Sequence, residues 1–126
     1  MHPRKILIVD DSKLIHKMFE VMLRGHHLVH ANDGVEGIQR LAENVDVDLI
    51  LLDINMPRMN GLEFLAELEK DNALSEIPVV VVSTEGKEED TQRAIDLGAR
   101  GYITKPFQSE QVLEIIAKLP VAGAAE

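Results

Sequence analysis

The sequence predicts an α/β fold in which helices cover both faces of a parallel β-sheet. Short runs of aliphatic, mostly β-branched residues alternate with amphipathic segments along the chain, which is the pattern of repeated strand–helix units. Two of these runs, at residues 49–52 and 79–82, contain no polar residue, as expected of central strands that are buried on both faces. Five strand–helix units with short connections imply right-handed crossovers and a parallel sheet.

The first part of the chain contains two predicted strand–helix units. The first strand covers residues 6–9, and the apolar residues Leu14, Ile15, Met18, Phe19 and Met22 then recur at helical spacing until Gly25. A weaker strand at residues 28–30 leads into a second helix. We assign the apolar face of this helix to Val35, Ile38, Leu41, Ala42 and Val45.

The middle of the chain contains the two central strands. The first of them ends at Asp53, and the turn that follows contains Asn60 and Gly61, which favour a helix that begins near Leu62. Pro78 then introduces the strand at residues 79–82. We therefore expect the most buried strands of the sheet to be the two that come directly before and after the third helix in the sequence.

The last part of the chain contains the fourth and fifth helices with a short strand between them. The fourth helix spans residues 88–97 and ends at Gly98, which lacks a Cβ and can adopt the left-handed conformation. A strand at residues 102–104 follows. The apolar residues of the fifth helix, Val112, Leu113, Ile115, Ile116 and Leu119, precede Pro120, which cannot continue it.

Composition limits the classes of function. With 126 residues the chain is long enough for one domain, and we expect an ordered core over about residues 4–119 and a frayed tail at residues 120–126. The 13 Lys+Arg and 22 Asp+Glu residues give a net charge of -9, which argues against direct binding of nucleic acid or anionic membranes. There is no Cys, which excludes disulfides and thiolate metal sites. The apolar run at residues 6–9 is too short for a signal sequence or a membrane span, so we expect a cytoplasmic protein.

Polar residues follow four of the predicted strands. They are Asp10 with Asp11, Asp53, Ser83 with Thr84, and Lys105. Each of them alone could cap a helix, open a turn or be a solvated charge. The carboxyl ends of parallel strands share one edge of the sheet, however, so we expect the four groups to converge there. Three carboxylates in one place repel each other, and a divalent cation with oxygen ligands would stabilise them.

These residues resemble the CheY-like receiver domains of two-component response regulators over nearly the whole chain. The matching motifs are Val9-Asp10-Asp11-Ser12, LLDINMPRMNG at residues 51–61, Val82-Ser83, and GYITKPF at residues 101–107. The resemblance implies a flavodoxin-like sheet of order 2-1-3-4-5 that is flanked by five helices. It also implies a phosphorylation-activated signalling switch, which is not a conventional enzyme although it catalyses its own phosphorylation and dephosphorylation.

The resemblance assigns a role to each residue of the predicted site. It makes Asp53 the phosphoacceptor, and it makes Asp10, Asp11, Asp53 and the backbone carbonyl of Asn55 the ligands of Mg²⁺. Ser83 and Lys105 would contact the phosphoryl group, and Ser83 and Tyr102 would form the switch pair. The Lys105–Pro106 peptide would be cis. Physical chemistry supports the first of these roles. A carboxylate with a reference pKa of about 3.9 is ionised at neutral pH and can attack phosphorus once its charge is offset.

The resemblance also implies partners. The phosphoryl donor would be a histidine kinase or a phosphotransfer protein, and the target would be a protein that binds the face formed by the fourth helix, the fifth strand and the fifth helix. We expect no direct binding to nucleic acid and no binding to membranes. Since no effector segment follows Pro120 in the sequence, we expect either a stand-alone receiver or part of a longer regulator.

Two other classes of function remain open at this point. A haloacid dehalogenase-like phosphatase also places an Asp, a hydroxyl and a Lys after successive strands, but Asn55 occupies the position where such enzymes have an acid/base Asp. The second class is an unphosphorylated receiver-like scaffold. We interpret the cluster of His26, His27 and His30 as surface residues, and no glycine-rich nucleotide-binding motif is present.

Overall fold

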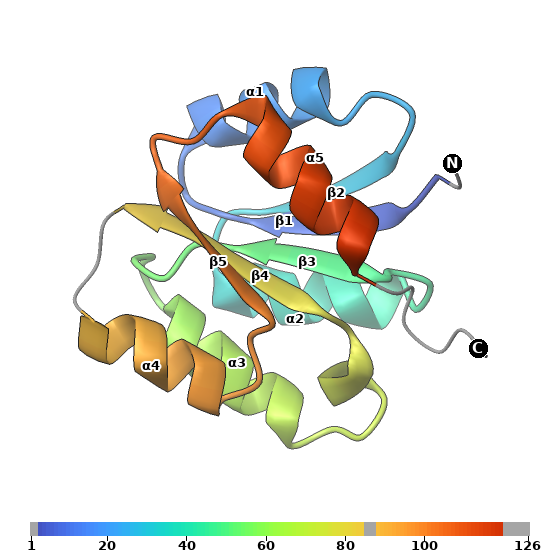
Figure 1. The fold of residues 1–126 in the computed structure, drawn as a ribbon. Coiled ribbons are helices and arrows are strands. Elements are labelled where there is room, and N and C mark those ends of the chain that lie inside the picture. Colours follow the sequence, from blue (N-terminus) through green and yellow to red (C-terminus); the bar gives the residue numbers. More distant parts are fainter. Residues whose placement is uncertain (1–2, 85–87, 120–126) are drawn as a thin grey trace.

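The computed structural model describes residues 3–84 and 88–119, and it contains a five-stranded parallel sheet (Figure 1). The strands have the order β2-β1-β3-β4-β5, so the predicted fold class and strand order are confirmed. Their bounds are β1 (Lys5–Val9), β2 (His27–Ala31), β3 (Leu49–Leu52), β4 (Val79–Thr84) and β5 (Gly101–Lys105). The predicted tail at residues 120–126, including the stop at Pro120, lies outside the described residues.

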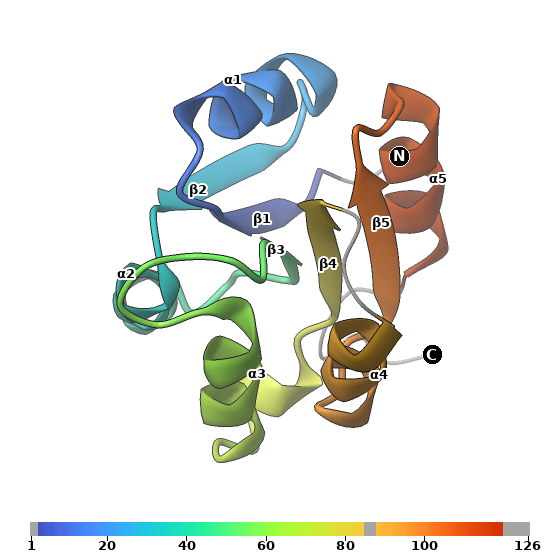
Figure 2. The ribbon, with the colours of Figure 1, turned by 90° about the vertical axis from the view of Figure 1, so that its left-hand side faces the viewer.

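Five α-helices cover the two faces of this sheet. They are α1 (Lys13–Met22), α2 (Gly34–Glu43), α3 (Gly61–Glu69), α4 (Glu88–Asp96) and α5 (Ser109–Lys118), and a 3₁₀ turn, η1 (Leu74–Glu76), precedes β4. Helices α1 and α5 lie on one face, and α2, α3 and α4 lie on the other (Figures 1 and 2). Within the described ranges, no helix is both long and apolar enough to cross a membrane.

The alternation of side chains along the strands builds two hydrophobic cores. In β3, Ile50 and Leu52 contribute to the core under α2, α3 and α4, whereas Leu49 and Leu51 contribute to the core under α1 and α5. All four side chains are buried, because β3 lies between β1 and β4. The prediction that this run forms a central strand is therefore confirmed.

The turn after β3 brings α3 directly against the end of the strand. Asn60 caps α3 by accepting a hydrogen bond from the Glu63 amide at 2.9 Å, and Glu63 returns a bond from its side chain to the Asn60 amide. A Cβ at Gly61 would overlap the backbone carbonyl oxygen of Asp53 and lie 2.7 Å from the Cα of Ile54. Gly61 thus permits the close approach that places the helix start beside Asp53.

Five apolar residues that the periodicity placed on helix faces are exposed. Val45 is 90% exposed, because α2 ends at Glu43 and Val45 follows the helix. The amide of Asn44 donates to the backbone oxygen of Arg40, and its side chain donates to the same oxygen, which ends the helix. The assignment of Val45 was therefore wrong. Leu14 and Met18 in α1, Ala42 in α2 and Leu113 in α5 are also exposed. Gly98 follows α4 with a φ of +105°, as predicted.

Arg4 connects both ends of the described chain at the edge of the sheet opposite the site. Its buried guanidinium donates to the Asp48 carboxylate at 2.8 Å and to the Asp48 backbone oxygen at 3.0 Å. It also donates to the backbone oxygens of Ile116 and Leu119 at 2.9 and 2.8 Å. These two carbonyls lie at the carboxyl end of α5, where a helix lacks internal donors. Arg4 therefore fixes α5 to the sheet.

We expect the substitution Arg4→Ala to lower the free energy of unfolding by about 3 kcal/mol, because it removes the cation from a partly buried carboxylate and a donor from three carbonyls. Urea denaturation would measure this change. The matched control is Lys5→Ala, which removes the neighbouring ion pair between Lys5 and the exposed Asp46. Solvent screens that pair, so the control should have a much smaller effect. Equal losses in the two variants would contradict the role of Arg4.

Candidate functional site

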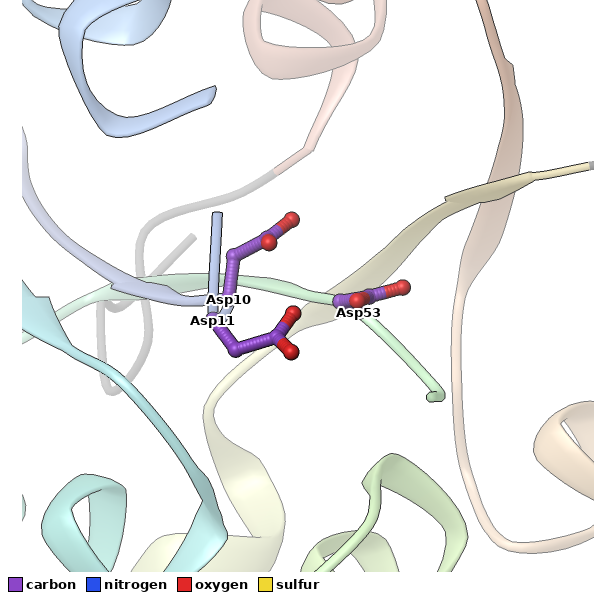
Figure 3. A group of neighbouring side chains, drawn as sticks. All are labelled: Asp10, Asp11 and Asp53. Carbon is purple, nitrogen blue, oxygen red and sulfur yellow. The ribbon is translucent and has the colours of Figure 1, made fainter. Parts of the chain in front are cut away.

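Three carboxylates lie together at the carboxyl edge of the sheet (Figure 3). Asp10 and Asp11 follow β1, and Asp53 follows β3, and one carboxylate oxygen from each lies within 4.8 Å of the others. Asp10 and Asp53 are buried, and Asp11 is exposed. The strands β1 and β3 are neighbours with Val9 opposite Leu52, so the residues that follow them emerge side by side. Across residues 3–84 and 88–119, this is the one such group of three or more potential metal ligands.

Two further polar side chains reach this cluster from β4 and β5. The Nζ of Lys105 lies 2.8 Å from Oδ2 of Asp10 and 3.8 Å from Oδ1 of Asp53. The hydroxyl of the buried Ser83 donates to Oδ1 of Asp53 at 2.9 Å. The predicted convergence of polar groups on one edge is therefore present, except that Thr84 is exposed and makes no such contact in the described structure.

The site carries an excess of negative charge. Three carboxylates and one ammonium leave a formal charge of -2 when all are ionised. Burial and the adjacent Asp10 raise the pKa of Asp53, whereas Lys105 and the hydrogen bond from Ser83 act in the opposite direction. Carboxylate oxygens are the donors that hard divalent cations such as Mg²⁺ prefer, and the exposed Asp11 leaves the cluster open on one side. The residues present therefore fit a bound Mg²⁺ ion.

The remaining residues of the predicted site surround this cluster. Asn55 is exposed and lies two residues after Asp53. Tyr102 is half-buried on the edge strand β5 and packs against the core under α2, α3 and α4. Its hydroxyl is buried without a hydrogen-bond partner in the described part of the chain. The peptide between Lys105 and Pro106 is cis.

A buried histidine that was not among the predicted site residues contacts the backbone of Asp10. Nε2 of His16 lies 2.7 Å from the Asp10 carbonyl oxygen, and because a carbonyl can only accept, this nitrogen is the donor. Nδ1 of His16 lies 2.6 Å from Nδ1 of His30, whose Nε2 lies 3.2 Å from the carboxylate of Glu20. His16 precedes the buried Phe19 by three positions, so helical spacing could have placed it on the inward face.

The histidines that the sequence grouped together have separate environments. His27 is exposed, and Nδ1 of His26 accepts a hydrogen bond from the Arg4 amide at 2.8 Å. His30 is partly buried and faces His16. Of the three, the surface interpretation is therefore confirmed for His27, whereas His26 and His30 are partly buried, and His30 faces His16 and Glu20 of α1.

The raised pKa of Asp53 predicts a pH-dependent effect of its removal. The folded protein binds a proton at Asp53 more tightly than the unfolded chain, whose pKa is near 3.8, so ionisation costs stability as the pH rises through the folded-state pKa. Without metal, Asp53→Asn should therefore raise the melting temperature by a few degrees at neutral pH. This gain should vanish as the pH falls toward 3.8.

Thermal unfolding followed by circular dichroism in EDTA would measure this effect across the acidic to neutral range. Asp46→Asn is the matched control, because a hydrogen bond from Lys5 lowers the pKa of Asp46. Removal of that carboxylate should give no gain at neutral pH. A gain for Asp53→Asn that is absent, or that is independent of pH, would show that its ionisation does not cost stability.

Comparison with known proteins gives a family match over most of the chain. Residues 6–117 match the model of the response regulator receiver domain. The chemotaxis protein CheY1 of Helicobacter pylori is 36% identical over 113 residues, which cover 87% of this chain and 90% of that protein. The probable transcriptional regulator ycf29 of Pyropia yezoensis is 38% identical over 117 residues, which cover 91% of this chain. The chain spans about half the length of that second relative, at 52%.

A solved structure agrees with this assignment. The CheX-CheY-BeF3-Mg²⁺ complex from Borrelia burgdorferi contains a chain that superposes with a TM-score of 0.84 and 29% sequence identity, over 90% of this chain and 87% of the other. The acidic site at the carboxyl ends of the strands is consistent with the family model, with the identity to CheY1 and with this common fold. The chain therefore belongs to the family of response regulator receiver domains.

Proposed function

We propose that this receiver domain is a switch that accepts a phosphoryl group on Asp53 and thereby changes its affinity for a downstream protein. The donor would be the phosphohistidine of a histidine kinase or of a phosphotransfer protein. The observation that carries the proposal is the position of Asp53, which is buried between an acidic pair, a hydroxyl at 2.9 Å and an ammonium at 3.8 Å. Lys105 offsets part of the charge of such a nucleophile, and the remaining negative charge suits a divalent cation.

The proposal includes a Mg²⁺ ion. Asp10, Asp11 and Asp53 would hold it through carboxylate oxygens, together with the backbone carbonyl of Asn55. The excess negative charge of the cluster supports this assignment, and so does the similarity to the chain of the Borrelia burgdorferi complex, which contains BeF3 and Mg²⁺. When bound, the ion supplies positive charge beside the phosphoryl oxygens.

The residues of this chain position and balance the transfer. An oxygen of the Asp53 carboxylate attacks phosphorus, so that a P–O bond forms while the P–N bond of the donor breaks. The electron pair of the broken bond stays on the donor imidazole, which takes up a proton. Lys105, which already pairs with Asp10, offsets the charge of the phosphoryl group, and the Ser83 hydroxyl donates to one of its oxygens instead of to Asp53.

The same residues provide a path from the site to an output surface, which we propose is formed by α4, β5 and α5. Ser83 lies on β4, which pairs with β5 so that Val81 is opposite Tyr102. A groove of about 430 Å³ runs beside Tyr102 and α5, between Thr104 and Gln111. A shift of Ser83 toward the phosphoryl group would change the packing around Tyr102. Because coupling between sites is reciprocal, a target that prefers the phosphorylated form would also slow the loss of phosphate.

Phosphoryl uptake tests the proposal. Incubation with acetyl phosphate and Mg²⁺ should add the mass of one phosphoryl group to the wild-type protein, and intact-mass spectrometry would detect it as a base-labile, acid-stable modification. Asp53→Asn should remain unmodified. Lys105→Ala should slow uptake by about 100-fold, because it removes a positive charge next to the reacting group.

The matched control for the lysine is Lys118→Ala, which removes an exposed ammonium at the end of α5. This variant should take up phosphate at the wild-type rate. The proposal is wrong if Asp53→Asn is modified with unchanged kinetics. Uptake that proceeds equally well in EDTA would remove Mg²⁺ from the mechanism.

A further inference from the structure

The loop between β3 and α3 is fastened to the beginning of α2 by an ion pair. Nε of Arg58 donates to Oδ2 of Asp33 at 2.8 Å, and Nη2 of Arg58 lies 2.5 Å from the same oxygen. Nη2 also lies 3.8 Å from a carboxylate oxygen of Glu36. The side chain of Asp33 is only 5% exposed, although that of Arg58 is 58% exposed. We call this pair the Asp33–Arg58 clasp.

Asp33 uses its two carboxylate oxygens for two different structural elements. Oδ1 accepts a hydrogen bond from the Glu36 amide at 2.9 Å and so caps α2, while Oδ2 binds Arg58. Burial would raise the pKa of this carboxyl, but the bonds from the Glu36 amide and from Arg58 bring its pKa below the usual value. The clasp therefore involves a carboxylate that is held in place by the helix it caps.

A backbone contact supports the clasp. The amide of Gly34 donates to the carbonyl oxygen of Met59 at 3.0 Å. A Cβ at Gly34 would lie 2.6 Å from Cγ of Met59, so the loop lies directly against the start of α2. At the other end of the loop, the amide of Gly61 donates to the carbonyl oxygen of Ile54 at 2.8 Å.

The backbone of Arg58 has a conformation that this residue type seldom adopts. Its φ is +65°, in the left-handed region, where a Cβ makes unfavourable contacts with the backbone. A non-glycine residue remains in this region when the surrounding structure holds it there. The two contacts from the Arg58 side chain to Asp33 provide such a restraint, in addition to the backbone hydrogen bonds at Met59 and Ile54.

We propose that Asp33 and Arg58 are positioning residues for the Mg²⁺ site. Arg58 lies three residues after Asn55 in the same short loop, and a change of conformation at Arg58 would move the Asn55 carbonyl relative to Asp53. Neither side chain of the clasp is among the carboxylates of the acidic cluster. The inference rests on the proposed function, because there Asn55 supplies a backbone ligand.

Two substitutions remove the clasp while they keep its local surroundings. Asp33→Asn retains an oxygen that can cap α2 but removes the charge that binds Arg58. Arg58→Asn removes the guanidinium, and Asn tolerates the left-handed conformation better than most residues. Arg58→Lys is a milder variant that keeps a positive charge but loses the two-nitrogen contact with Asp33.

Isothermal titration of the full chain with Mg²⁺ would measure the Kd of each variant, and thermal unfolding in EDTA would measure its stability. We expect Asp33→Asn and Arg58→Asn each to raise the Kd by about 10-fold, and the double variant to raise it no further, because both remove the same contact. The Kd of Arg58→Lys for Mg²⁺ should lie between the Kd values of these variants and that of the wild type. Should Asp33→Asn fold poorly, Arg58→Asn carries the test, since its side chain is mostly exposed.

Lys70→Ala is the matched control, because it removes an exposed ion pair with Glu67 at the other end of α3. It should leave the Kd for Mg²⁺ unchanged. A wild-type Kd in folded clasp variants would overturn the proposal, whether or not their melting temperatures are lowered. A wild-type protein that binds Mg²⁺ but never accepts phosphate would refute the proposed function and leave the Kd comparison intact. A wild-type protein that does not bind Mg²⁺ would overturn this inference.

Discussion

The mutual repulsion of three carboxylates at one edge of the sheet is the constraint on which the site depends. Parallel strands direct all of their carboxyl ends to the same edge, and β1 and β3 are neighbours, so Asp10 and Asp53 emerge side by side. The sheet cannot relieve this repulsion by moving, because β3 is packed on both faces. The strand β5 instead contributes Lys105, which offsets part of the charge, and β4 contributes Ser83, whose hydroxyl donates a hydrogen bond to Asp53.

Most of the fold and the convergence of the site could be predicted from the sequence, because they depend on local signals. Two apolar runs identified the central strands, and Asn60 and Gly98 identified helix ends that the structure confirms. Periodicity failed at Val45, since it does not show where Asn44 ends a helix. The roles of single residues at the site remain predictions.

Contacts between side chains of different elements could not be predicted in this way. The pair of His16 and His30, and the clasp between Asp33 and Arg58, depend on how α1, β2 and the loop after β3 are placed in space. The left-handed φ of Arg58 could not be predicted from the residue type, because arginine does not favour this conformation. At the opposite edge, the contacts of Arg4 with the backbone oxygens of Ile116 and Leu119 depend in the same way on how α5 is placed against the sheet.

The proposed switch requires the change of charge at the acidic edge to be transmitted through Ser83 and Tyr102 to α5. Backbone amide chemical shifts, compared with and without beryllofluoride plus Mg²⁺ as a stable mimic of the phosphoryl group, test this claim most directly. The account predicts shift changes that extend from Asp53 through Ser83 to Tyr102 and along α5. Changes confined to the pocket of Asp10, Asp11 and Asp53 would contradict it.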